Sequence, residues 1–170
     1  RRDPGFKEIL NSADLFIPDG FSIAFAAWLR RIKLKNRVPG PDLFLEGCRL
    51  AAERGYRVFF YGDTEETLEA LVTSLKDRFP DLKIAGVHSP PFRPLTEEED
   101  AQEITLINDS GADIVWVGLG LPKQERWMFE HREKLNGPVV VGAGAAFKLL
   151  SGDVNRAPPG IRNAGLEWFW

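Results

Sequence analysis

The amino-acid sequence predicts a single α/β domain, a doubly wound, Rossmann-like and mostly parallel sheet with helices on both faces. Short runs of β-branched and aromatic residues alternate with longer amphipathic segments along the chain. These short runs are almost continuously apolar, which is typical of parallel strands covered on both faces. With 170 residues, of which 44% are apolar and 28% charged, the chain is long enough for one globular core. Residues 1–170 are therefore expected to form one domain.

Five strands are expected, each recognised by a short apolar run. They lie at residues 15–17, 58–61, 82–87, 114–117 and 139–141. Helices are predicted at residues 20–34, 41–54, 65–79, 97–111, 122–135 and 160–168. Strands and helices that alternate in this way, joined by right-handed crossovers, place a parallel sheet between two layers of helices.

The third and fourth helices carry the clearest boundary signals. The third has leucines at helical spacing and a cap supplied by Asp63 or Thr64. The fourth begins with the spacing of a capping box, formed by Thr96 and Glu99, and ends near Gly111.

The composition excludes several functional classes. The 22 basic and 25 acidic residues give a net charge of -3, so no global field attracts nucleic acid. The single cysteine, Cys48, excludes an internal disulfide and a multi-cysteine metal cluster, and it is typical of a reducing, cytoplasmic compartment. No apolar run approaches the roughly 20 residues that span a bilayer. The aromatic end at residues 168–170 and the absence of an initiator Met indicate a fragment of a longer protein.

The turns that follow the strands are the expected ligand site, because ligands of open parallel sheets bind at the carboxyl ends of the strands. These turns are residues 18–20, 62–64, 88–94, 118–125 and 142–148. Three of the five are rich in glycine, which lets backbone amides approach a bulky anion such as a diphosphate. A nucleotide is therefore the expected class of ligand.

The turn at residues 118–125 is the most informative one. Pro122 suits the first position of a helix, which places Lys123 within the first turn. The helix dipole disfavours a cation there, and a bound phosphate would remove the conflict. The alternative is a solvated lysine that pairs weakly with a nearby acid.

Asp19 and Asp63 each have two interpretations. Both precede an expected helix, so either carboxylate serves as an N-cap in the simpler interpretation. Asp19 also faces the expected ligand edge, where it could accept a proton from a hydroxyl group. For Asp63 the cap is favoured. Phe92 either stacks on a base or packs against the loop prolines.

Other enzyme classes fit poorly. Residues 142–147 begin like a dinucleotide fingerprint, but Phe147 stands where a small residue belongs, so a nicotinamide cofactor is not expected. His88 and His131 lack companions for a zinc site. The patterns of a serine hydrolase and of a phosphate-binding loop ending in Gly-Lys-Ser/Thr are absent from the sequence.

Residues 30–37 form a run of cations without an acid. Such a run usually marks a solvated helix end. The alternative is contact with anionic lipid headgroups, for which Trp28 would suit the interface.

Taken together, the ordered motifs are similar to those of the WecG/TagA/CpsF family of bacterial glycosyltransferases. The resemblance runs along nearly the whole chain and rests on residues 14–20, 37–43, 118–127, 142–152, 156–158 and 165–168. It implies transfer of a hexose, often N-acetylmannosamine or its uronic acid, from a UDP donor to a sugar on polyprenyl diphosphate, with inversion. The product belongs to a cell-surface polysaccharide or teichoic acid. The expected location is cytoplasmic and peripheral, at the inner face of the plasma membrane.

The resemblance also assigns roles to residues. Asp19 matches the proposed general base and Gln124 the active-site amide. The residues expected to bind the UDP-sugar are Gly20, Arg37, Gly40, Gly62, Phe92, Gly118, Gly120, Pro122, Lys123, Glu125, Gly142, Gly144, Phe147, Lys148 and Arg156. No Asp-x-Asp motif occurs, so no metal or other cofactor is expected and protein donors should stabilise the leaving diphosphate.

Three departures from the family pattern bear on function. From the resemblance we expect that two family segments are missing from these 170 residues: an N-terminal segment that lines the active site and a basic C-terminal appendage that contacts membrane. Lys148 replaces the usual aspartate, so it is expected to meet a phosphate or a uronate. A non-catalytic nucleotide-binding or assembly domain of the same fold is the alternative, and a homo-oligomer is left open.

Overall fold

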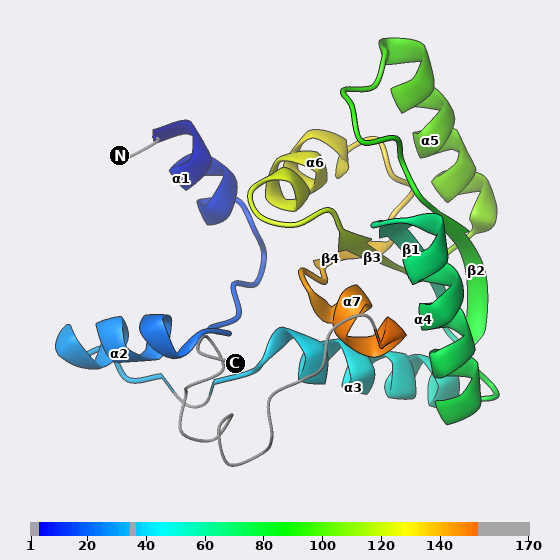
Figure 1. Ribbon diagram of the computed structural model, residues 1–170. Helices are drawn as coiled ribbons and strands as arrows, with labels where there is room; N and C mark the ends of the chain where they lie inside the picture. Colours follow the sequence, from blue (N-terminus) through cyan, green and yellow to red (C-terminus); the bar gives the residue numbers. More distant parts are fainter. Residues whose placement is uncertain (1–3, 35–36, 153–170) are drawn as a thin grey trace.

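The computed structural model describes residues 4–34 and 37–152. Its helices in these ranges are α1 (Pro4–Asn11), α2 (Phe21–Leu29), α3 (Gly40–Arg54), α4 (Glu65–Arg78), α5 (Glu97–Ser110), α6 (Lys123–His131) and α7 (Ala146–Ser151). Its strands are β1 (Arg57–Gly62), β2 (Lys83–His88), β3 (Ile114–Gly118) and β4 (Val139–Gly142). Figure 1 shows the arrangement of these elements.

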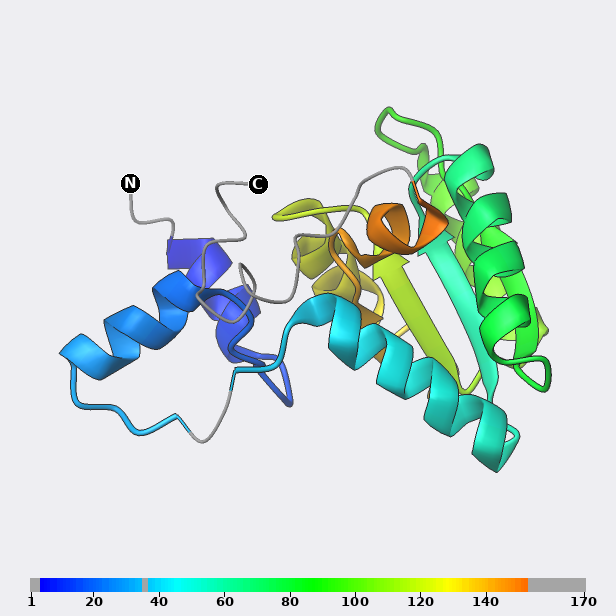
Figure 2. The ribbon, with the colours of Figure 1, turned by 60° about the horizontal axis from the view of Figure 1, so that its bottom comes forward.

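The four strands form one parallel sheet in the order β2-β1-β3-β4. The chain leaves β1 for β2 on one side and then returns past β1 to β3 on the other side. The strand order therefore reverses between β1 and β3. Helices α3, α4 and α7 cover one face of the sheet, and α5 and α6 cover the other (Figure 2). The prediction of a doubly wound parallel sheet is confirmed.

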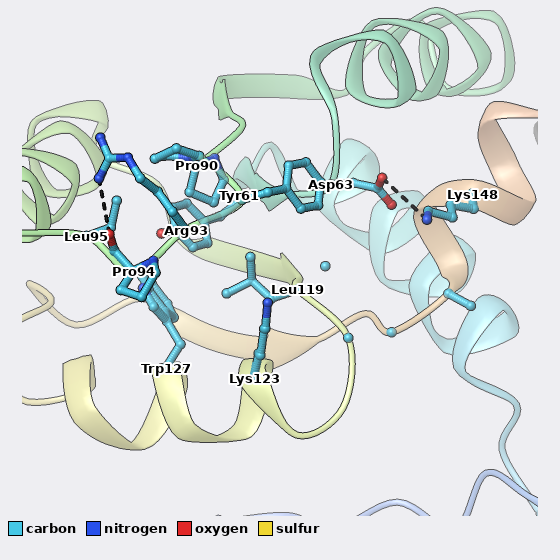
Figure 3. A pocket seen from close by; sticks show the side chains of 16 residues that line it. Tyr61, Asp63, Pro90, Arg93, Pro94, Leu95, Leu119, Lys123, Trp127 and Lys148 are labelled. Carbon is cyan, nitrogen blue, oxygen red and sulfur yellow. Dashed lines mark hydrogen bonds and ion pairs between the residues drawn. The ribbon is translucent and has the colours of Figure 1, made fainter.

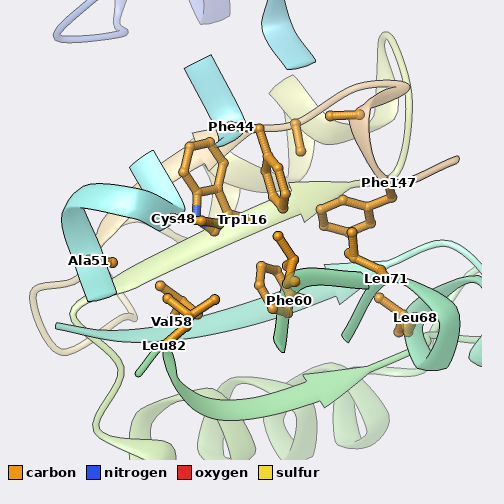
Figure 4. Packing of buried hydrophobic residues seen from close by; sticks show 13 residues of the cluster. Phe44, Cys48, Ala51, Val58, Phe60, Leu68, Leu71, Leu82, Trp116 and Phe147 are labelled. Atoms are coloured by element: carbon orange, nitrogen blue, oxygen red, sulfur yellow. The ribbon is translucent and has the colours of Figure 1, made fainter. Parts of the chain in front are cut away.

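The core on the α3, α4 and α7 face combines aliphatic side chains with four aromatic rings (Figure 4). Phe44 lies at its centre, with its ring centroid 4.7 Å from that of Trp116 and 5.6 Å from that of Phe147. Phe60 meets Phe147 edge-on at 5.9 Å. Such tilted and edge-on contacts stabilise aromatic pairs beyond the burial of their area.

Helix caps appear where the sequence predicts them. The Thr64 hydroxyl accepts a hydrogen bond from the amide of Thr67, so Thr64 and not Asp63 caps α4. Thr96 and Glu99 form both bonds of a capping box at the start of α5. Gly111 ends that helix in the left-handed conformation.

The predicted strand at residues 15–17 is wrong. This segment is irregular, and the side chains of Leu15 and Phe16 are 76% and 59% exposed. A short apolar run forms a strand only where a neighbouring strand can pair with it. Here, within the described residues, the neighbouring segment instead donates a single hydrogen bond, from the amide of Val38 to the carbonyl of Pro18, at 3.1 Å.

Two helices, α2 and α6, end several residues earlier than predicted. Helix α2 ends at Leu29, and Arg31 then adopts a left-handed conformation with φ +57°. Helix α6 ends at His131, before the predicted residue 135. The short helices α1 and α7 were not predicted, because eight and six residues carry little periodicity. The predicted helix at residues 160–168 lies outside the described residues.

The buried cysteine supplies a test of this packing. Burial raises the pKa of the Cys48 thiol from 9.0 to about 12. We expect the folded protein to resist alkylation by iodoacetamide at about pH 8, and the unfolded protein to react. Mass spectrometry with and without denaturant measures this, and rapid labelling of the folded protein would contradict the core assignment.

The same pKa difference makes stability depend on pH. The Cys48 thiol loses its proton at a lower pH in the unfolded protein than in the folded protein, so the contribution of Cys48 to the free energy of unfolding falls as pH rises above 9.0.

Candidate functional site

A pocket of about 540 Å³ lies at the carboxyl ends of β1 and β3. Figure 3 shows the side chains that line it. Its lining residues come from the carboxyl ends of the four strands and from the segments that follow them. They are Tyr61 in β1 and Asp63 after it, residues 90–95 after β2, Gly118 at the end of β3 with Leu119, Gly120, Lys123 and Trp127 after it, and Gly144, Ala145 and Lys148 after β4. The position is the point where the strand order reverses, which is where doubly wound sheets bind ligands.

Stacked rings form the inner wall of the pocket. Tyr61 and Trp127 stack with their centroids 4.4 Å apart, and His88 and His131 continue the stack on either side. The Tyr61 hydroxyl donates to the carboxylate of Glu103, which also lies 3.1 Å from Nε2 of His88. Burial, followed by this bond to Glu103, raises the pKa of Tyr61. The hydroxyl therefore remains a proton donor and holds its ring in place.

Two lysines reach the pocket from different helices (Figure 3). Lys123 is the first residue of α6 and has an exposed side chain. Pro122 precedes the helix, so its predicted place at the first helical position is wrong and Lys123 stands even closer to the free amides. Lys148, on α7, places its Nζ 3.9 Å from Oδ1 of Asp63. Both cations lie where a bound anion would meet them.

Asp63 is a pocket residue that sequence reasoning treated as a cap. Its side chain is 7% exposed and its backbone adopts φ +58°, a conformation that is uncommon outside glycine. One carboxylate oxygen accepts the amide hydrogen of Thr64 at 3.0 Å. Among the described residues that line the pocket, Asp63 is the one carboxylate, so it balances part of the positive charge.

The proline-rich loop after β2 forms the outer wall. Arg93 binds both oxygens of Glu99 at 2.7 and 2.6 Å, which fastens the loop to the start of α5. Arg93, helped by the amide of Thr96, lowers the pKa of Glu99 to about 2. Phe92 is 79% exposed at the rim, so its ring is available for stacking.

Five of the seven predicted glycines lie at the ends of β1, β3 and β4 or in the turns that follow, and they divide into two groups. Gly120 and Gly144 have positive φ, and a Cβ at either one would meet nothing within 4 Å. They lie open to the pocket. At the other three positions a Cβ would collide with a neighbour: Gly62 with the backbone of Gly118 at 2.7 Å, Gly118 with the Phe147 ring at 2.4 Å, and Gly142 with the Gln124 amide at 2.9 Å. These three glycines bring the strand ends together, and of them only Gly118 also lines the pocket.

Phe147 is fully buried in the aromatic core. The side chain does not line the pocket, although the resemblance predicts that Phe147 binds the UDP-sugar. Its ring packs under Gly118 and supports the floor of the pocket.

Gln124 lies beneath the pocket and joins α6 to the turn after β4. Its Oε1 accepts a hydrogen bond from the amide of Gly144 at 3.1 Å, and its Nε2 donates to Glu125 at 2.8 Å. The side chain is buried, and neither Gln124 nor Glu125 lines the pocket. In this arrangement Gln124 positions the open turn at Gly144.

We expect Gln124→Glu to destabilise the protein by about 1–3 kcal/mol, because the new carboxylate would face the carboxylate of Glu125 in a buried site. Thermal or urea unfolding measures the change. Gln102→Glu on the exposed part of α5 is the matched control and should change stability by less than about 0.5 kcal/mol. Equal effects of the two substitutions would contradict the positioning role.

Four further predicted site residues, Asp19, Gly20, Arg37 and Gly40, lie outside the pocket, near the starts of α2 and α3. Asp19 is exposed, and one of its oxygens lies 3.3 Å from where a Cβ of Gly40 would stand. Gly20, not Asp19, directly precedes α2. Arg37 is half-buried. These four residues do not line the pocket, and Arg156 lies outside the described residues.

Comparison with known proteins identifies the family. A model described as the glycosyl transferase WecG/TagA/CpsF family matches residues 1–170. The chain belongs to this family. This match confirms the resemblance seen in the sequence motifs. The residues that line the pocket lie within the matched range.

Three curated relatives of this WecG/TagA/CpsF chain carry the same description, N-acetylglucosaminyldiphosphoundecaprenol N-acetyl-beta-D-mannosaminyltransferase. The protein of Bacillus subtilis strain 168 is 30% identical over 169 residues, which cover 99% of this chain and 64% of the relative. The protein of Bacillus spizizenii is 32% identical over 169 residues with the same coverage. That of Staphylococcus aureus strain NCTC 8325 is 30% identical over 165 residues, or 97% of this chain and 63% of the relative. The chain thus spans less than two thirds of these proteins.

Within residues 4–34 and 37–152, no three His, Cys, Asp or Glu side chains are grouped so that they could hold a metal ion. No helix in the same part of the chain has both the length and the apolar character needed to cross a bilayer.

Proposed function

We propose that this chain carries the donor-binding and catalytic residues of an inverting glycosyltransferase. The reaction is transfer of N-acetylmannosamine, or a related hexose, from a UDP donor to a polyprenyl-diphosphate-linked sugar in the synthesis of a cell-surface polymer. The relatives support the class of acceptor, since their shared description names an N-acetylglucosaminyl diphosphoundecaprenol. The observation that carries the proposal is the pocket at the reversal point, with Lys123 and Lys148 on its walls.

The donor fits this pocket by charge and shape. The diphosphate would lie beside Lys123 and the free amides at the start of α6, where both the cation and the helix end favour negative charge. The open backbone of Gly120 and Gly144 lets the phosphates approach. Uracil would stack on the exposed ring of Phe92. We propose that Lys148 meets a phosphate or a uronate, with Asp63 holding its ammonium group in place.

Catalysis needs one general base and stabilisation of the leaving UDP. We assign the base to Asp19, an exposed carboxylate outside the donor pocket. In an inverting transfer the acceptor attacks from the side opposite the leaving diphosphate, so the base belongs on the acceptor side. Protein donors, not a metal ion, are proposed to stabilise UDP. The lipid-linked acceptor leads us to propose peripheral contact with the inner face of the plasma membrane.

The test is transfer of labelled N-acetylmannosamine from its UDP donor to N-acetylglucosamine on a short-chain lipid diphosphate, by the full-length protein in the presence of EDTA. We expect a β-linked disaccharide product. Binding of UDP without turnover would overturn the catalytic proposal in favour of a nucleotide-binding domain. Activity that requires an added divalent cation would overturn the metal-free mechanism.

Replacement of Lys123 by methionine has two expected effects of opposite sign. UDP affinity should fall about 10- to 100-fold, because a charge-assisted contact with the diphosphate is lost. The ligand-free protein should become slightly more stable, by roughly 0.5 kcal/mol, because a cation leaves the start of a helix. Calorimetry and thermal unfolding measure the two effects. Lys76→Met, an exposed lysine on α4, is the control, and unchanged UDP affinity in Lys123→Met would contradict the site.

A further inference from the structure

Helix α2 presents an apolar face to solvent. Its nine residues, Phe-Ser-Ile-Ala-Phe-Ala-Ala-Trp-Leu, include no charged side chain. Phe25, Trp28 and Leu29 follow one another at helical spacing, and Trp28 and Leu29 are 70% and 63% exposed. Ile32, just after the helix, is exposed as well. We call these four residues the α2 face.

The α2 face is not a surface that the rest of the described chain covers. Figures 1 and 2 both draw α2 projecting away from the four-stranded sheet. Ala27 is the buried side chain among those described for this helix. Phe25 and Trp28 stack on each other with ring centroids 5.7 Å apart, so these two rings form one continuous part of the α2 face. Exposed apolar surface of this kind marks an interaction site.

Positive charge adjoins the α2 face. Arg30, Arg31 and Lys33 follow the helix directly, and none of them forms an ion pair or a side-chain hydrogen bond within residues 4–34 and 37–152. No aspartate or glutamate occurs between Asp19 and Asp42. An apolar face bordered by unneutralised cations matches the surface of an anionic bilayer, where aromatic side chains enter the interface and cations meet lipid phosphates.

The length of the helix limits how it can meet a membrane. Nine residues rise only about 14 Å, about half the thickness of the hydrocarbon core. The helix can therefore lie in the interface but cannot span the bilayer. This orientation directs the α2 face into the headgroup region and leaves the cations at the level of the phosphates.

We infer that the α2 face, with Arg30, Arg31 and Lys33, docks this protein on the surface of an anionic lipid bilayer. The inference deepens the proposed function, because a lipid-linked acceptor must be met at a membrane. Vesicle binding does not depend on catalysis, so the two proposals can fail separately. Asp19 lies two residues before α2, so docking through this helix would bring the proposed base close to the lipid surface.

The test is flotation of the 170-residue chain with vesicles of phosphatidylcholine containing roughly one third phosphatidylglycerol. We expect binding to these vesicles and little binding to pure phosphatidylcholine. Each cation near an anionic surface raises affinity roughly fivefold, so the triple variant Arg30→Gln/Arg31→Gln/Lys33→Gln should bind about a hundredfold more weakly. Trp28→Ser/Leu29→Ser should also lose binding.

Matched controls separate docking from general effects. Lys76→Gln/Arg78→Gln removes exposed cations from α4, and Leu106→Ser removes an exposed apolar side chain from α5. Both should bind vesicles like the unmodified chain. Circular dichroism verifies that every variant is folded.

Two results would overturn the inference. The first is vesicle binding by the cation and apolar variants that equals that of the controls. The second is a dimer in sedimentation velocity that Trp28→Ser/Leu29→Ser converts to monomer while vesicle binding persists, which would assign the α2 face to a second copy of the chain. In either case sugar transfer to a water-soluble acceptor remains an independent test of the proposed function.

Discussion

Replacing Asp19 by asparagine is expected to lower the rate of sugar transfer about 10²- to 10⁴-fold while leaving UDP affinity unchanged. Asparagine keeps the size of the side chain but cannot accept the proton of the acceptor hydroxyl. The exposed carboxylate lies beside the start of α3 and outside the proposed donor pocket, so the substitution should not disturb donor binding. Steady-state kinetics with a short-chain acceptor, together with calorimetry of UDP, measures the two quantities.

Two other aspartates serve as comparisons for Asp19. Asp14→Asn changes an exposed carboxylate on the same segment and should leave the rate unaltered. Asp63→Asn should raise the KM for the donor, because Lys148 loses the carboxylate that faces it. If Asp19→Asn retains the full rate and Asp63→Asn loses it, the base is the pocket aspartate and our assignment is wrong.

Replacing Phe147 by alanine is expected to destabilise the protein by about 3–5 kcal/mol. The ring is fully buried, meets Phe44 and Phe60, and packs against Gly118. Its loss leaves a cavity next to Gly118, under the floor of the proposed donor pocket. Urea unfolding measures the change in the free energy of unfolding.

Phe92→Ala is the matched control for Phe147→Ala, because its ring is exposed at the rim of the pocket. It should change stability by less than about 0.5 kcal/mol and should instead weaken UDP binding. A loss below about 1 kcal/mol in Phe147→Ala would contradict the packing role that the structure assigns to this ring.

The sheet and its covering helices could be predicted from sequence because local signals agree with the fold there. The four strands of the sheet and the helices α3, α4 and α5 begin and end within one residue of their predicted bounds. The run at residues 15–17 has the same local appearance as a strand. Whether a neighbouring strand pairs with it depends on long-range packing, which a short apolar run does not encode.

The site could be predicted in part, because the carboxyl edge of a parallel sheet gathers the turns that follow its strands. Phe92, Gly118, Gly120, Lys123, Gly144 and Lys148 were predicted and do line the pocket. Tyr61 and Trp127 were missed, since large aromatic residues in a strand or helix are usually core.

The contact between Asp63 and Lys148 could not be predicted from the sequence either. These residues are 85 positions apart, and only the reversal of strand order brings β1 and α7 to one pocket. The position of Glu103 in the sequence could have indicated a buried polar contact. Glu103 shares the buried face of α5 with Ile107, and a carboxylate among apolar residues needs a partner, here Tyr61 and His88.

The most direct test of the central claim is titration of the ¹⁵N-labelled chain with UDP, followed by the backbone amide resonances. The account predicts that the largest shifts occur at Gly118, Gly120, Lys123, Gly144 and Lys148, around the pocket where the strand order reverses. Absence of shifts at saturating UDP, or shifts confined to residues outside this pocket, would contradict it.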